Sequence, residues 1–153
     1  MRLYIVQHGD AVPKDADPDR PLSDQGQADI QRLKEWLGRH DTRVGRILHS
    51  GKTRARQTAE ILGSLLEHGG SIDEQEGLAP NDSPGDFIEQ MKNAEQDILV
   101  ASHMPFVART VSQALTGTPD SKPVDFSPGS IAGIERREDD TWCLFLFVRP
   151  DNF

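Results

Sequence analysis

The sequence lacks the residues and patterns that mark several large protein classes. It has one cysteine, Cys143, among 153 residues, so no disulfide framework can form. Cys143 lies in an apolar run, and we interpret it as a core residue. No apolar run approaches the roughly 20 residues that a transmembrane helix requires. The first residues lack the charged, apolar and small-residue segments of a signal peptide, so we expect a cytoplasmic protein.

Positive charge is also scarce, because 17 lysines and arginines stand against 25 aspartates and glutamates, which gives a net charge of −8. A field of this sign disfavours nucleic acid and anionic membranes as partners. Any site for an anion must therefore be built locally from arginine, histidine and backbone amides. The length and the ordinary hydrophobic fraction of 35% suit a single domain over residues 1–153 with one core.

Apolar runs predict three buried strands, each followed by a turn and then by a helix. The strands are expected at residues 3–6, 46–49 and 97–102. Apolar residues at helical spacing predict helices at residues 24–37, 53–65 and 106–115. The first of these helices has Ser23 or Asp24 as a candidate N-cap, and His68-Gly69-Gly70 is interpreted as the C-cap of the second.

Other elements are marked less clearly. We expect a third strand at 71–78, a modest helix at 86–95, an antiparallel hairpin formed by 131–134 and 142–148, and a tail from 149. The alternation of strands and helices predicts an α/β fold, a three-layer sandwich in which helices cover both faces of a mostly parallel central sheet. Residues 12–23 form a long proline-rich loop, which in a compact domain usually borders a site.

Polar side chains follow each of the three buried strands at the point where the strand ends. His8 and Gly9 follow the first strand, Ser50 and Arg54 the second, and His103 the third. The carboxyl ends of parallel strands meet at one edge of an α/β sheet, so these side chains should share one pocket. Arg54 lies in the first turn of a helix, where a cation opposes the helix dipole unless an anion is bound. Two imidazoles and a guanidinium suit a dianion, whereas two histidines without cysteine or carboxylate ligands rarely hold zinc.

The motifs at these strand ends resemble those of the histidine phosphatase superfamily, and within it the short bacterial phosphohistidine phosphatases of the SixA type. They are His8-Gly9-Asp10-Ala11, Ser50-x-x-x-Arg54-Ala55-x-Gln57-Thr58, Ser102-His103-x-Pro105 and Arg20-Pro21-Leu22-Ser23. The resemblance runs from residue 2 to about residue 148. It implies a phosphoglycerate mutase-like core without lid insertions.

The resemblance also implies a metal-independent phosphatase without a cofactor. His8 would attack phosphorus and form a transient phosphohistidine. Arg54 and His103 would hold the equatorial oxygens of the transferred group. The residues expected to add phosphate contacts are Gln7, Gly9, Arg20 and Ser50. From the residues alone, a solvated surface charge remains an equal interpretation of Arg20.

The sequence departs from the family's pattern at Gln7, because the first motif usually begins with arginine. A glutamine offers a neutral amide where arginine offers a charged fork. The lost charge-assisted contact is worth roughly 1.5–3 kcal/mol, or about 10- to 150-fold in rate if it acts only in the transition state.

A second departure from the family's pattern is that the sequence does not identify the general acid. Its candidates are Glu74, Glu76, Asp82 and Asp10, and none of the first three lies in a recognisable motif.

Chain length favours a protein substrate. Residues 59–96 must supply a helix, a strand and another helix, which leaves no room for a lid, and an open site suits a phosphate displayed on another protein. We therefore expect a monomer that dephosphorylates a phosphorylated histidine-containing protein in signal transduction. The sequence leaves three other hypotheses open. The first is a phosphatase of small phosphoesters, the second is a non-catalytic phosphate- or phosphoprotein-binding module in which Gln7 has removed activity, and the third is a structural domain with incidental histidines.

Overall fold

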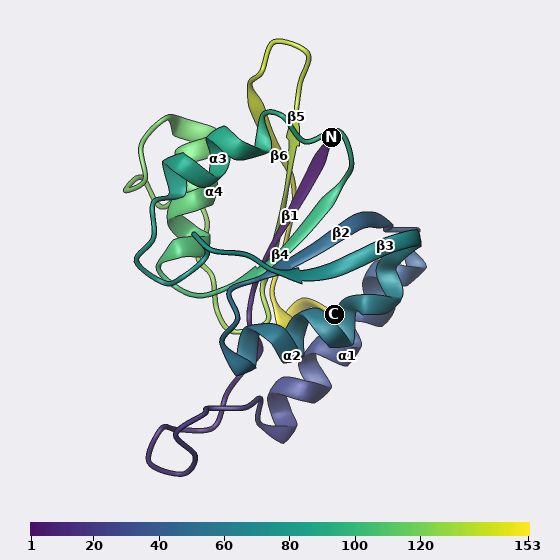
Figure 1. Ribbon diagram of the computed structural model, residues 1–153, viewed down its shortest axis with the longest axis vertical. Helices are drawn as coiled ribbons and strands as arrows, with labels where there is room; N and C mark the ends of the chain where they lie inside the picture. Colours follow the sequence, from purple (N-terminus) through teal and green to yellow (C-terminus); the bar gives the residue numbers. More distant parts are fainter.

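The computed structural model describes residues 1–153 and contains a six-stranded mixed sheet with helices on both faces (Figure 1). The strands are β1 (Arg2–Gln7), β2 (Val44–His49), β3 (Leu66–Glu74), β4 (Ile98–Ser102), β5 (Ile131–Arg136) and β6 (Trp142–Val148). The helices are α1 (Asp24–Arg39), α2 (Thr53–Ile61), α3 (Pro84–Met91) and α4 (Phe106–Thr116), with short 3-10 turns at Leu62–Leu65 and Pro150–Asn152. The predicted three-layer α/β architecture is confirmed.

The strand order, β3-β2-β4-β1-β5-β6, places the three buried strands beside one another. β4 pairs in parallel with β1 on one side and with β2 on the other. β5 and β6 form the predicted antiparallel hairpin, which extends the sheet beyond β1. The carboxyl ends of β1, β2 and β4 therefore meet at one edge, and His8, Ser50 and His103 directly follow these ends.

Alternating side chains of the central strands fill two cores, one on each face of the sheet. In β1, Leu3 and Ile5 pack with apolar residues of α3 and α4, whereas Tyr4 and Val6 pack with those of α1 and the α2 region. Figure 1 shows α3 and α4 on one side of the sheet and α1 and α2 on the other. Successive side chains of a strand point to opposite faces of the sheet, so this alternation is expected. Packing against both cores fixes the position of β1 just before His8.

α1 begins where the sequence predicts it. The hydroxyl of Ser23 accepts a hydrogen bond from the Gly26 N–H, as an N-cap does, and the buried stripe of the helix includes Ile30, Leu33 and Leu37. α4 also matches its predicted range and ends at Gly117 in the left-handed conformation. None of the helices is long and apolar enough to span a lipid bilayer.

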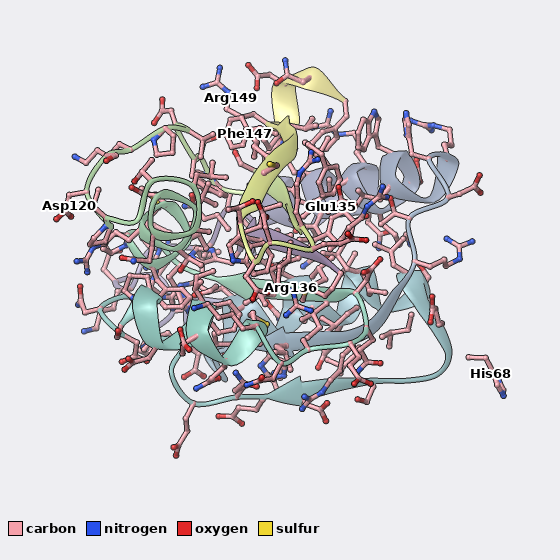
Figure 2. All side chains as sticks on the ribbon, turned by 90° about the horizontal axis from the view of Figure 1, so that it is seen from above. His68, Asp120, Glu135, Arg136, Phe147 and Arg149 are labelled. Atoms are coloured by element: carbon pink, nitrogen blue, oxygen red, sulfur yellow. The ribbon has the colours of Figure 1, made fainter.

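The prediction was wrong between residues 62 and 78. α2 ends at Ile61, and His68-Gly69-Gly70 lies inside β3 instead of capping a helix. β3 also ends at Glu74, four residues before the predicted end. β3 pairs only with β2, so most of its side chains reach solvent and its sequence lacks the apolar pattern of a buried strand. A register shift opposite Val44 to Arg46 accommodates the glycines, and Figure 2 shows His68 extending far from the rest of the molecule.

Two smaller differences concern chain segments near helix ends. The helix expected at 86–95 spans Pro84–Met91, because the Ser83 hydroxyl caps it by accepting from the Asp86 N–H. The expected tail contains the turn Pro150–Asn152, and the carbonyl oxygen of Phe153 accepts a hydrogen bond from Arg32 at 2.8 Å.

Gly26 is a point where the loop after β1 packs directly against α1. A Cβ atom there would lie 2.0 Å from the carbonyl oxygen of Asp10. We expect Gly26→Ala to lower the free energy of unfolding by about 2 kcal/mol, because backbone must move to relieve the contact. Gly38→Ala in the same helix has no atom within 4 Å of the new Cβ, and should raise it by about 0.5–1 kcal/mol. Urea denaturation of both variants measures the two effects, and equal effects would contradict this close packing.

Candidate active site

His8 lies immediately beyond β1, and its imidazole is only 8% exposed. Nδ1 is 2.7 Å from the carbonyl oxygen of Gly9. A carbonyl oxygen only accepts, so Nδ1 carries a proton, and the neutral ring keeps a lone pair on Nε2. That atom accepts a hydrogen bond of 3.2 Å from the Nε–H of Arg54. The ring is therefore oriented with its unprotonated nitrogen toward a guanidinium.

The turn after His8 is tied to α2 through Thr58. The Gly9 N–H donates to the Thr58 hydroxyl at 3.1 Å, and that hydroxyl donates to the Arg54 carbonyl oxygen at 2.8 Å. A Cβ on Gly9 would lie 2.9 Å from Ile30 and 3.0 Å from the Gly26 carbonyl oxygen. Glycine is thus required here by close packing, and Thr58 sets the distance between the first two strand ends.

Arg54 is the second residue of α2, as predicted. The N-terminus of α2 has no side-chain cap and no acidic residue in its first turn, and Lys52 adds a second cation there. Burial, followed by the charge of Arg20, lowers the pKa of Arg54. Arg54 forms no salt bridge with a carboxylate within the structure. The unpaired guanidinium and the positive end of the helix dipole both favour an anion at this position.

His103 completes the group from the end of β4. Its ring centroid lies 5.0 Å from that of His8, and its Nε2 is 2.6 Å from the Ser50 hydroxyl. Its Nδ1 is buried without a hydrogen-bond partner. The Ser50 hydroxyl also accepts from the Lys52 N–H at 3.4 Å. His8, Arg54, Ser50 and His103 therefore come together from three strand ends, as the sequence predicts.

Both imidazoles are held in the neutral form. Burial is the largest cause that lowers the pKa of His8 to about 4, and the charges of Arg54 and Arg20 add to it. The pKa of His103 is lowered to about 3 by burial, then by His8, Arg54, Lys52 and Arg20. Cations thus dominate the field at this edge of a protein whose net charge is −8. Such a local field is suited to a bound anion.

Arg20 and Gln7 lie at the margins of this group. The Arg20 Nε–H donates to the Val12 carbonyl oxygen at 3.2 Å, and its backbone adopts a positive φ of 47°, which is uncommon for arginine. Its charge acts on both histidines, although no hydrogen bond joins it to them. Gln7 is 7% exposed, and its Oε1 is buried without a hydrogen-bond partner. No hydrogen bond connects the Gln7 side chain to the other site residues.

Comparison with known proteins gives a family for this arrangement. Residues 3–80, about half of the chain, match the family model of the histidine phosphatase superfamily (branch 1). The chain is also 30% identical to the phosphohistidine phosphatase SixA of Escherichia coli (strain K12), over 99% of this chain and 96% of that protein. The chain belongs to the histidine phosphatase superfamily. It is therefore a hydrolase of the phosphatase type, as the motifs predict.

Solved structures agree with this assignment. The structure of the protein histidine phosphatase SixA complexed with tungstate has a TM-score of 0.86 to this histidine phosphatase, at 26% identity and with 99% of both chains covered. A putative alpha-ribazole-5'-P phosphatase from Escherichia coli has a TM-score of 0.78 at 16% identity, with 98% of both chains covered. The second likeness shows that the fold is shared, and no more.

Among the candidate general acids of this histidine phosphatase, Asp10 has a charge that acts on His8. The Asp82 carboxylate accepts from the Ala79 N–H at 2.8 Å and, with Glu76, lines a hollow beside α3. Glu74 ends β3, opposite His49, and its carboxylate lies against Gly51, the residue after Ser50. Asp10 accepts from the Ser23 hydroxyl at 2.6 Å. None of these carboxylates hydrogen-bonds to His8, Arg54 or His103, and no three His, Cys, Asp or Glu side chains are grouped so as to hold a metal ion.

Stability should depend on pH through His8 and His103, the two of the three buried histidines whose pKa is lowered furthest. The unfolded chain binds protons at histidine below pH 6.5, whereas folded His8 and His103 bind them only near pH 4 and 3. The free energy of unfolding should therefore be constant above about pH 6.5 and fall as the pH is lowered toward 4, by on the order of 2–3 kcal/mol per histidine.

Denaturant unfolding at pH 7 and pH 5 measures this slope, and His103→Asn should reduce it. His40→Asn is the matched control, because it makes the same substitution at an exposed histidine outside the site. An unchanged slope in His103→Asn would contradict a buried neutral imidazole at residue 103.

Proposed function

We propose that this histidine phosphatase removes the phosphoryl group from phosphohistidine on a partner protein, through a transient phosphohistidine at His8 and without a metal ion. The observation that carries this proposal is the neutral His8 imidazole, whose Nε2 lone pair faces the unpaired guanidinium of Arg54. A phosphoryl group placed between them meets a nucleophile and a cation together. We also propose that residues 1–153 act as one domain, in the cytoplasm.

In the first step, His8 Nε2 attacks phosphorus as the bond from phosphorus to the substrate's nitrogen breaks. The electron pair of that bond leaves with the substrate imidazole, which departs as a neutral ring because its other nitrogen carries a proton. In the second step a water molecule attacks the same phosphorus, the bond to Nε2 breaks, and inorganic phosphate leaves. Arg54 would bind phosphoryl oxygens throughout, because its charge offsets theirs in the transition state.

The Gly9 carbonyl oxygen has a direct part in this scheme. Phosphorylation of Nε2 leaves an imidazole that carries a substituent on both nitrogens and hence a positive charge. The hydrogen bond of 2.7 Å from Nδ1 to Gly9 stabilises that charge and keeps the ring from turning. The backbone therefore stabilises the intermediate without any acidic side chain at this point.

Ser50 and His103 would supply further donors to the phosphoryl oxygens. In the structure these two groups hydrogen-bond to each other at 2.6 Å. A phosphoryl oxygen that enters between them can accept from the Ser50 hydroxyl and from His103 Nε2 when that atom carries the ring proton.

None of the candidate carboxylates hydrogen-bonds to His8, Arg54 or His103, and this supports phosphohistidine as the substrate class. Phosphohistidine is a phosphoramidate, and its imidazole leaving group needs little protonation, whereas an alkyl phosphoester needs an acid to protonate its alkoxide. The similarity to a protein named phosphohistidine phosphatase over almost the whole chain supports the same substrate. So does the similarity to a protein histidine phosphatase that binds tungstate, a tetrahedral oxyanion like phosphate.

Phosphate release from a histidine-phosphorylated carrier protein tests the proposal. With EDTA present, the wild type should release phosphate, and His8→Ala should release at least 1000-fold less, on the order expected for loss of a nucleophile. Equal release by both proteins would contradict the assignment of His8. Loss of wild-type activity in EDTA, with recovery on adding a divalent metal, would contradict the metal-free reaction.

Gln7→Arg tests the effect of the neutral amide at the start of the first motif. A guanidinium there would add a charge-assisted contact to the phosphoryl group, so kcat on the same carrier should rise by about 10- to 150-fold. Tungstate should also bind more tightly to the variant, as measured by calorimetry. Because residue 7 is buried, a thermal melt must first show that the variant is folded. A folded variant with unchanged kcat and tungstate affinity would contradict a phosphate contact from this position.

A further inference from the structure

A second hollow opens beside the phosphate site and belongs to no step of the proposed reaction. It has a volume of about 480 Å³ and lies between the start of α4 and the segment that follows this helix. We call it the α4 groove, and its lining comprises Met104, Pro105, Ala108, Arg109, Pro119, Asp120, Lys122, Val124 and Asp125. Met104 directly follows His103 in the chain, so the groove and the proposed phosphate site have neighbouring residues at this point.

The walls of the α4 groove are partly apolar and open to solvent. Met104 is 41% exposed, one of three large hydrophobic residues in the chain with this degree of exposure. Ala108 and Val124 add apolar surface on the two sides. An exposed methionine next to an apolar hollow is typical of surfaces that bind other proteins, since its flexible thioether adapts to a partner.

One charged side chain of the α4 groove, Lys122, has no oppositely charged partner. Arg109 lies 3.6 Å from Asp120, and Asp125 lies 3.8 Å from Arg149, so both groove carboxylates have a cation beside them. Figure 2 shows Asp120 and Arg149 on the outer side of the molecule, away from its centre. Lys122 is exposed and forms no salt bridge. Lys122 is therefore the charge in the groove that an acidic side chain of a partner could meet.

We propose that the α4 groove docks the partner protein whose phosphohistidine enters the site. An apolar side chain of the partner, near its phosphohistidine, would pack on Met104 and Val124. An acidic side chain beside it would meet Lys122. A partner whose phosphohistidine reaches His8 must pass close to Met104, because Met104 directly follows His103 in the chain. This inference rests on the proposed function and adds to it the surface that selects the substrate.

Two substrates of different size test the groove. The first is a small carrier protein phosphorylated on a histidine within a helix, and the second is free phosphohistidine, which reaches the site but not the groove. For Met104→Ser, kcat/KM on the carrier should fall about tenfold through a higher KM, while kcat/KM on free phosphohistidine stays unchanged.

Lys122→Glu should lower kcat/KM on the carrier most strongly at low salt, because the exposed charge acts by attracting the partner.

Leu144→Ser is the matched control for Met104→Ser. Leu144 is 40% exposed and belongs to β6, at the far edge of the sheet from β2. This variant should leave both substrates unaffected. An equal loss on both substrates in Met104→Ser would overturn the docking surface, because the side chain would then support the phosphate site itself. An unchanged KM for the carrier would overturn it as well.

Carrier binding separates this inference from the proposed function. If the wild type hydrolyses neither substrate, the proposed function fails, and the groove is then judged by the dissociation constant of the phosphorylated carrier. A dissociation constant about tenfold higher for Met104→Ser than for Leu144→Ser would support the groove. Equal constants, or no binding by the wild type, would overturn it.

Discussion

Parallel pairing of β4 with both β1 and β2 is the constraint on which the site depends. Each pairing fixes where a strand ends relative to its neighbour, and the three ends carry His8, Ser50 and His103. The register leaves little freedom, because a shift by one residue would turn every side chain of a strand to the opposite core. Two apolar cores, one on each face, therefore hold the catalytic edge in place. The packed sheet therefore sets the relative positions of His8, Ser50 and His103.

Burial gives the polar residues at this edge their chemical character. An exposed histidine would be partly protonated near neutral pH, and a protonated imidazole has no lone pair for attack. Burial and neighbouring cations favour the neutral ring, and the Gly9 carbonyl oxygen selects the nitrogen that carries the proton. The same cations attract the substrate's charge. One arrangement thus favours both a neutral His8 and a bound anion.

Much of the fold, and the grouping of the site residues, could be predicted from the sequence. β1, β4, α1 and α4 are buried on the faces that their apolar spacing indicates, so the pattern and the structure have the same physical origin. β3 was placed wrongly because an edge strand with exposed side chains leaves little apolar pattern to read. The contact between Ser50 and His103 could not be predicted as a bond, since it joins residues 53 apart through side-chain geometry. The groove beside His103 depends on how the segment after α4 returns along that helix, and no local pattern encodes that path.

The bond between Ser50 and His103, and that between Arg54 and His8, have a consequence for the end of the catalytic cycle. In the structure the groups proposed to hold a phosphoryl group hydrogen-bond to one another. Inorganic phosphate that bound to these groups would replace both bonds, and their loss would offset part of the free energy that the cations contribute to its binding. Departure of the product would restore both bonds. These internal hydrogen bonds would therefore compete with the product of the proposed reaction.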